Sequence, residues 1–211
     1  MNNEIRNRLS SRVGSITRKI SSVREKYPDA RLRIKIAQGM SKTACKVLRQ
    51  YLNFEPPSDC FEWLTIFNGI EGSYIKTLYD HNAIMEILAV YEEWKEFQYF
   101  PLAGDGCGGE YLVIPFKKDN ETYFPVVFVE CDQPDKELGK YTYIASSSIP
   151  IFLEIFLREI LYDLEMLFDE GYVNKDDVPP DFWWPYDKDL VLQNDPDIVS
   201  FNIRLPWEEE E

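Results

Sequence analysis

The sequence is poor in the residues that most often carry catalysis or bind metals. It has one histidine, His81, and its four cysteines include no Cys-x-x-Cys pair. Zinc ribbons need closely spaced ligand pairs, and Ser/His/Asp or Cys/His arrangements need a histidine beside the nucleophile. His81 stands in a turn-like context with no positioned nucleophile near it in the sequence. We therefore expect reduced, buried thiols, no metal, no cofactor and no catalytic residues, and we interpret the chain as a non-enzyme.

Long apolar runs and the pattern of a signal peptide are also missing. No stretch approaches the roughly 20 apolar residues that cross a bilayer. Met1-Asn2-Asn3-Glu4 leads into mixed charge without the apolar core of a secretion signal. The sequence therefore predicts a soluble, cytoplasmic protein without a membrane span. With 211 residues and 45% hydrophobic content, it suits one domain with extensions.

Basic residues are scarce outside the first quarter of the chain. Residues 1–50 hold 13 Lys and Arg against 3 Asp and Glu, whereas the remainder holds 10 basic and 34 acidic residues, for a net charge of −14 overall. A basic arm thus precedes an acidic body. An acidic body repels nucleic acid and attracts cationic partners, chiefly by raising encounter rates.

The basic arm has the apolar spacing of an amphipathic helix over residues 4–27. Seven apolar residues recur at steps of three or four: Ile5, Leu9, Val13, Ile16, Ile20, Val23 and Tyr27. Such a helix can lie on an anionic membrane or touch nucleic acid. We favour the interpretation that it is a surface helix docked on the core, because its apolar stripe has no Trp or Phe that would anchor it in a membrane.

The centre of the sequence is a glycine-rich stretch between two β-prone runs, over residues 97–114. Its four glycines are Gly104, Gly106, Gly108 and Gly109, and Asp105 lies among them. Glycine accepts positive φ and Asp bonds back to its own backbone, so the stretch predicts a tight hairpin near the middle of a sheet. The glycines also spell G-x-G-x-x-G, but a phosphate site needs a helix after them, and a β-prone run follows. Asp105 and Glu110 could form an acid–base pair; a turn-stabilising Asp105 is the better interpretation.

The remaining patterns predict an α+β fold, a mostly antiparallel central sheet flanked by N- and C-terminal helices. The expected helices are 41–52, 58–67 closed by Asn68-Gly69, 83–94 and 149–168 ended by Gly171; the expected strands are 32–36, 74–78, 122–131, 141–145 and an edge strand at 198–205. The aromatic stretch 178–186 should pack partly on the body, and Glu208 to Glu211 should be a solvated acidic terminus.

The order of these signals resembles the SUKH superfamily, the Smi/Knr-type domains, over about residues 41–165. The resemblance is carried by Pro56-Pro57-Ser58 before Phe61-Glu62-Trp63-Leu64, Asn68-Gly69, residues 100–113, Pro125-Val126-Val127-Phe128, and Ala145-Ser146-Ser147-Ser148 with Phe152-Leu153. It implies a division into a basic N-terminal extension (1–40), a SUKH-like domain (41–168) and an acidic, aromatic-rich tail (169–211).

The resemblance implies a binding role and no catalytic motif. Most bacterial members are immunity proteins that neutralise a cognate toxin, often a nuclease, of a polymorphic or contact-dependent system. On that basis we expect a basic toxin as partner and no direct contact with nucleic acid. The predicted contacts lie around the hairpin: Trp94, Asp105, Glu110 and Tyr111. The alternatives are a regulatory scaffold like the fungal members in cell-wall signalling, with the basic helix as docking arm, and a small-ligand binder or enzyme.

Overall fold

The computed structural model describes residues 1–28, 34–71, 77–106, 108–130, 142–170 and 188–208, and in these ranges the fold is α+β, as predicted. Seven strands form one antiparallel sheet in the order β1-β2-β3-β4-β5-β8-β9. Their bounds are β1 (Lys35–Gln38), β2 (Phe67–Glu71), β3 (Thr77–Leu78), β4 (Phe100–Gly104), β5 (Gly109–Val113), β8 (Val126–Glu130) and β9 (Thr142–Ser146). β6 (Phe116–Lys118) and β7 (Glu121–Tyr123) form a separate hairpin.

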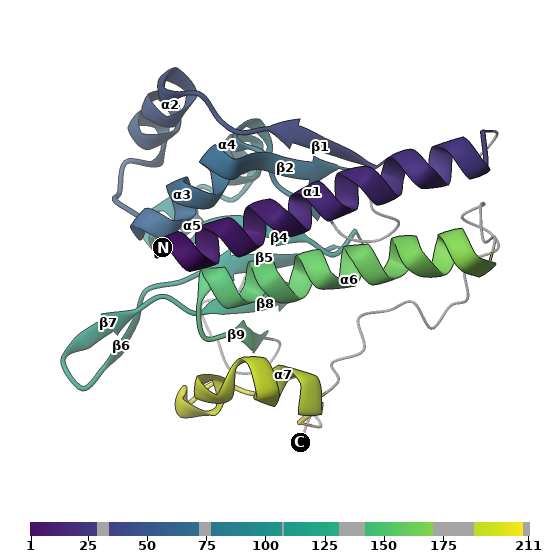
Figure 1. The fold of residues 1–211 in the computed structure, drawn as a ribbon. Coiled ribbons are helices and arrows are strands. Elements are labelled where there is room, and N and C mark those ends of the chain that lie inside the picture. The colour runs from purple at the N-terminus through teal and green to yellow at the C-terminus, as the bar shows by residue number, and fades with distance from the viewer. Residues whose placement is uncertain (29–33, 72–76, 107, 131–141, 171–187, 209–211) are drawn as a thin grey trace.

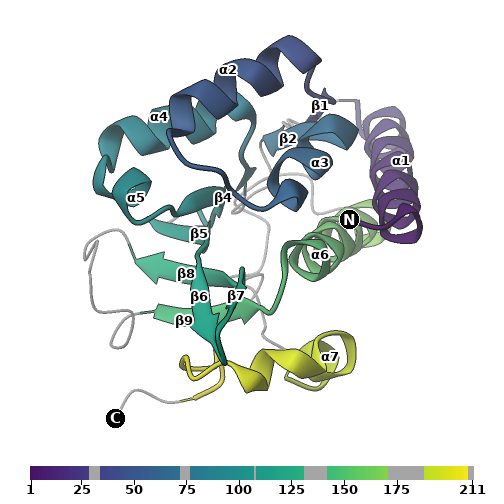
Figure 2. The same cartoon turned by 90° about the vertical axis from the view of Figure 1, so that its left-hand side faces the viewer.

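Helices cover both sides of the sheet. α1 (Asn3–Lys26) and α6 (Ile149–Glu170) run side by side along one face (Figure 1). Viewed from the end, α4 (His81–Val90) and α5 (Glu93–Glu96) lie on the opposite side of β4, next to α2 (Lys42–Leu52) (Figure 2). α3 (Ser58–Ile66) packs with α1 and leads directly into β2, while α7 (Lys188–Asn194) and a 3-10 helix, η2 (Pro196–Ser200), lie beyond β9.

The predicted basic helix is confirmed, and it is docked on the body. Its apolar stripe is buried at Leu9, Ile16, Ile20 and Val23, in the same core cluster as the apolar side of α6. Arg8 adds a 2.7 Å ion pair from its Nε to an Oε of Glu154 on α6. The stripe is therefore used inside the protein, which leaves no apolar face of α1 for a membrane. β1, which also belongs to the predicted extension 1–40, pairs with β2 in the main sheet.

The prediction that Asn68-Gly69 ends a helix is wrong, because α3 already ends at Ile66 and both residues lie in β2. Gly69 does have a positive φ of 88°, but a side chain there would meet the backbone at Asp80, 2.6 Å from its nitrogen. Asn68 turns toward the start of α4, where its Oδ1 accepts from the His81 backbone N–H at 3.1 Å. The dipeptide therefore joins β2 to α4, and His81 begins that helix with Asp80 as its cap instead of forming a turn.

Three other predicted elements differ in the structure. The predicted strand 122–131 begins only at Val126, because Asp119 and Asn120, with φ of 52° and 65°, turn the chain into the β6–β7 hairpin before it. The predicted helix 83–94 is split into α4 and α5. The predicted edge strand 198–205 is replaced by η2 and bends, although the Arg204 carbonyl still accepts from the Ile144 N–H of β9 at 2.9 Å.

The C-terminal segment 188–208 has its own small apolar cluster against the edge strand β9. Ile144, Val191, Ile198 and Phe201 are buried in it. Sequence patterns did not predict α7. The predicted helix stop at Gly171, the aromatic stretch 178–186 and residues 209–211 lie outside the described residues, as do most of the predicted strand 74–78 and the cysteines at 107 and 131.

Candidate protein-binding surface

The central hairpin is confirmed, and its turn is built as the sequence predicts. Gly106 and Gly108 have positive φ angles of 79° and 108°. The Asp105 backbone N–H donates to the Gly109 carbonyl at 2.9 Å, and the Gly109 N–H donates to Asp105 Oδ1 at 2.8 Å. Asp105 thus stabilises the turn. The chain after the glycines is β5, so the helix that a phosphate-binding G-x-G-x-x-G requires does not follow them.

The outer two glycines serve a different purpose, since they lie in the strands and admit close neighbours. A Cβ at Gly104 would lie 2.2 Å from the Tyr79 hydroxyl oxygen, and one at Gly109 would lie 2.0 Å from Phe128 Cζ. Real Cβ atoms do not approach other heavy atoms so closely. These two positions therefore require glycine for space, whereas Gly106 and Gly108 require it for backbone conformation.

Replacing Asp105 by alanine is expected to lower the free energy of unfolding by about 1 kcal/mol, because the Gly109 N–H loses its side-chain acceptor. Urea denaturation followed by circular dichroism would measure the change. Asp197→Ala, at an exposed carboxyl of η2, is the control and should change stability by less than about 0.5 kcal/mol. Equal effects of the two substitutions would contradict a turn-stabilising role for Asp105.

Glu110 lies inside the protein, on the far side of β5 from α6. It is only 7% exposed, and its Oε2 accepts a hydrogen bond from the Tyr79 hydroxyl at 2.6 Å. Burial raises the pKa of this carboxyl to about 7; the Tyr79 hydrogen bond opposes the rise and the nearby Asp105 charge adds to it. Glu110 is thus placed as a buried titrating group and not as an exposed contact.

Two further predicted contact residues are part of the core. Tyr111 packs between Phe128 and Phe152, with ring centroids 5.0 Å and 5.2 Å away. Trp94 is 3% exposed and stacks on Tyr91 at 4.3 Å. Of the four predicted contacts, Asp105 alone is partly exposed, so Trp94, Glu110 and Tyr111 cannot reach a partner in this conformation.

The structure does not bring the predicted contacts to one place. Trp94 precedes the first residue of β4, whereas Asp105 and Glu110 follow its last residue, and the two groups lie at opposite ends of the strand. Five strand residues at roughly 3.3 Å each separate them by about 16 Å.

The surroundings of Trp94 are exposed, and sequence reasoning missed them. α4 ends at Val90, the chain bends at Tyr91, and α5 follows. We call four exposed residues at this bend the elbow surface: Val90, Glu92, Glu96 and Phe97. Val90 is 71% exposed and Phe97 37%, although both are large and apolar. The signal in the sequence was the mixture of acids and aromatics over residues 90–99, although the predicted helix ended at Trp94 and the predicted β-prone run began at Phe97.

The single histidine takes part in a hydrogen bond between β2 and α4, and the two described cysteines lie wholly or partly inside the protein. The side-chain amide of Asn68 lies 2.9 Å from His81 Nδ1 and donates to it. Cys60 is fully buried, and burial raises the pKa of its thiol well above the usual value. Both of these cysteines are free, but only Cys60 is buried as predicted, because Cys45 is partly exposed.

Within the described ranges, no three or more His, Cys, Asp or Glu side chains gather in a way that could hold a metal ion. None of the helices in the same part of the chain is long and apolar enough to cross a membrane. A scan against protein-family models finds no family that matches the chain, and a search of curated proteins finds no significant match.

Proposed function

We propose that this protein is an immunity protein, which binds a cognate toxin and neutralises it by covering its functional surface, without catalysis of its own. The observation that carries the proposal is the unequal distribution of charge. Beyond residue 50 the chain has 34 acidic and 10 basic residues, and described acids of this region lie on the exposed parts of α4, α5, α6 and α7. The α+β fold is the one that the SUKH resemblance implies, and supports the proposal further.

The proposed mechanism is occlusion of a basic surface. Nuclease toxins hold phosphates with Lys and Arg, so a protein that presents carboxylates and apolar side chains can occupy the same surface. Opposite net charges also steer the two proteins together and speed their association, an effect that salt weakens. A non-covalent inhibitor of this kind requires no cofactor.

Growth rescue tests the proposal. The toxin domain encoded beside this gene is produced from an inducible promoter in a bacterium, with and without this protein. We expect growth to be restored by this protein but not by an empty vector, and an unrelated toxin to remain lethal in its presence. Failure to restore growth with any toxin domain encoded nearby, when both proteins are detected as soluble, would contradict the proposal.

A regulatory scaffold remains the alternative, and the basic face of α1 is the observation that favours it. Arg18 and the serines around it are exposed on the outer side of the helix. However, α1 is not a detachable arm, because four of its apolar residues are in the main core. Deleting residues 1–27 would remove part of that core, so loss of partner binding in such a deletion would not show that α1 contacts the partner.

A further inference from the structure

The elbow between α4 and α5 is held by its own backbone hydrogen bonds. The Tyr91 N–H donates to the Ile87 carbonyl at 2.9 Å and closes α4, and the Trp94 N–H donates to the Tyr91 carbonyl at 3.1 Å. The Tyr99 N–H donates back to the Trp94 carbonyl at 2.8 Å. Gln98 adopts a positive φ of 61°, which a non-glycine residue rarely does unless its surroundings fix it. The bend therefore has a defined shape before any partner binds.

Aromatic packing fixes the elbow from the inside. Trp94 points inward and stacks on Tyr91, and Phe97 packs on Tyr99 with ring centroids 5.5 Å apart. On the side facing α2, the Lys95 ammonium lies 4.6 Å from the centre of the Tyr51 ring. Lys95, the one basic residue of α5, is thus turned away from the outer face, where Glu92 and Glu96 lie.

The two glutamates of the elbow surface, like several other exposed acids in the described ranges, form no ion pair, whereas three exposed glutamates do. Glu4, Glu55 and Glu71 each pair with a nearby Arg or Lys. Within the described residues, the carboxylates of Glu92 and Glu96 have no such partner. Within the described residues, two carboxylates without an ion-pair partner and two exposed apolar side chains, Val90 and Phe97, therefore lie in one stretch of eight residues on a preformed bend.

We infer that the elbow surface is the contact site for the toxin, and that the toxin offers an apolar pocket rimmed by Lys or Arg. This inference rests on the proposed function. Binding energy at protein interfaces concentrates in a few anchors, often aromatic, that fill pockets of the partner, and charged residues favour the rim. Phe97 and Val90 fit the anchor role, and Glu92 and Glu96 fit the rim. A bend with a defined shape also loses little conformational entropy on binding.

The test measures binding of the toxin domain identified by growth rescue, in an inactivated form, to this protein and its variants by surface plasmon resonance. Glu96→Lys should lower the association rate roughly 10-fold at low salt, because it reverses a rim charge. Phe97→Ala should raise the dissociation rate about 30-fold through loss of an anchor. Thermal unfolding of each variant shows whether it is folded.

Matched controls carry the same changes elsewhere. Glu25→Lys alters an exposed glutamate on the outer side of α1, and Tyr162→Ala removes an aromatic side chain of α6 that is 58% exposed. Both should bind within about 3-fold of the unchanged protein. If Glu96→Lys and Phe97→Ala also bind within 3-fold, the inference is overturned while the proposed function stands. If the unchanged protein rescues growth but does not bind the toxin domain, occlusion and the elbow contact are both overturned.

Discussion

Replacing Asp195 by alanine should detach the C-terminal segment 188–208 from the body while the main core stays folded. Asp195 is fully buried, just before η2. One carboxyl oxygen accepts from Ser146 Oγ at 2.8 Å and from the Ser147 backbone N–H at 2.7 Å, and the other accepts from Ser147 Oγ at 2.5 Å. Alanine would leave the Ser147 N–H and hydroxyl, at the junction of β9 and α6, without this acceptor, whereas the Ser146 hydroxyl can still donate to the Ser148 carbonyl at 3.1 Å.

The expected cost is about 2–4 kcal/mol, since each donor left unsatisfied costs roughly 1–3 kcal/mol and the two donors of Ser147 are partly buried at one site. The loss falls on a segment whose apolar cluster is small and, within the described residues, shares only the partly buried Ile203 with the main core, so the effect should be local. Hydrogen exchange should show it directly: the Ile144 amide, which donates to the Arg204 carbonyl, should exchange much faster.

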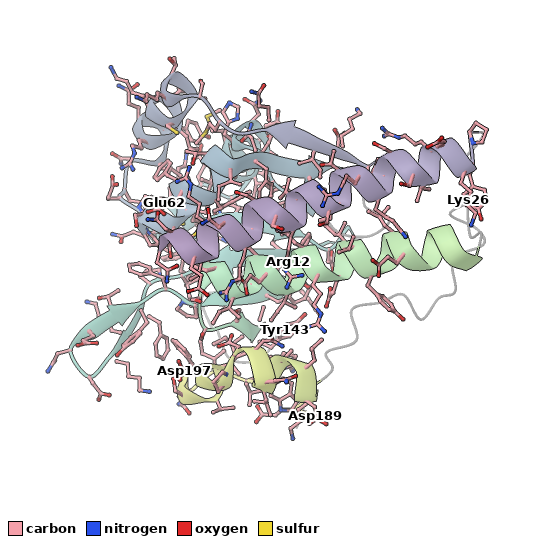
Figure 3. All side chains as sticks on the ribbon, in the orientation of Figure 1. Arg12, Lys26, Glu62, Tyr143, Asp189 and Asp197 are labelled. Carbon is pink, nitrogen blue, oxygen red and sulfur yellow. The ribbon has the colours of Figure 1, made fainter. Side chains whose placement is uncertain are left out.

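Asp197→Ala is the matched control for this experiment. Asp197 lies two residues away in the same segment, and its side chain is exposed (Figure 3). Its replacement should leave exchange at Ile144 unchanged. Equal protection of Ile144 in the Asp195→Ala variant and the unchanged protein would mean that apolar contacts alone hold the segment, contrary to the role assigned to the carboxylate.

The elements that the sequence predicted correctly are those with strong local signals. The stripe of α1 repeats over six turns, Ser41 caps α2 through the Ala44 N–H, and the turn of the central hairpin needs glycines, of which this stretch holds four within six residues. Such signals depend on neighbours within a few residues, so they can be read without knowing the tertiary structure. The break after Val90 and the start of α7 lack comparable signals.

The candidate contact residues failed to share one surface because their burial depends on partners distant in sequence. Tyr111 is buried by Phe152, from a helix some 40 residues later, and Glu110 by its position opposite Tyr79. From the sequence alone, a charged side chain in a β-prone run is predicted to be exposed, because such distant partners are not known. Asp195 illustrates the same limit, since its acceptor role depends on serines 48 and 49 residues earlier.

Replacing Glu110 by glutamine should remove a pH dependence of stability that the unchanged protein has between about pH 4.5 and pH 7. Burial raises the folded-state pKa of Glu110 to about 7 from an ordinary value of 4.5, so the folded protein binds the proton more tightly than the unfolded chain. The stability linked to that proton is fully present below pH 4.5 and is lost as the pH rises through 7. From this one group, the free energy of unfolding should fall by roughly 3 kcal/mol.

Glutamine keeps an oxygen that can accept from the Tyr79 hydroxyl, but it carries no charge to bury. The variant should therefore have the same free energy of unfolding as the unchanged protein near pH 4.5. At pH 8 its free energy of unfolding should be higher by about 1–3 kcal/mol, as measured by urea denaturation at each pH. Glu130→Gln, at an exposed carboxyl opposite Gly109, should give a curve parallel to that of the unchanged protein. A constant difference between Glu110→Gln and the unchanged protein from pH 4.5 to 8 would show that Glu110 does not titrate in this range.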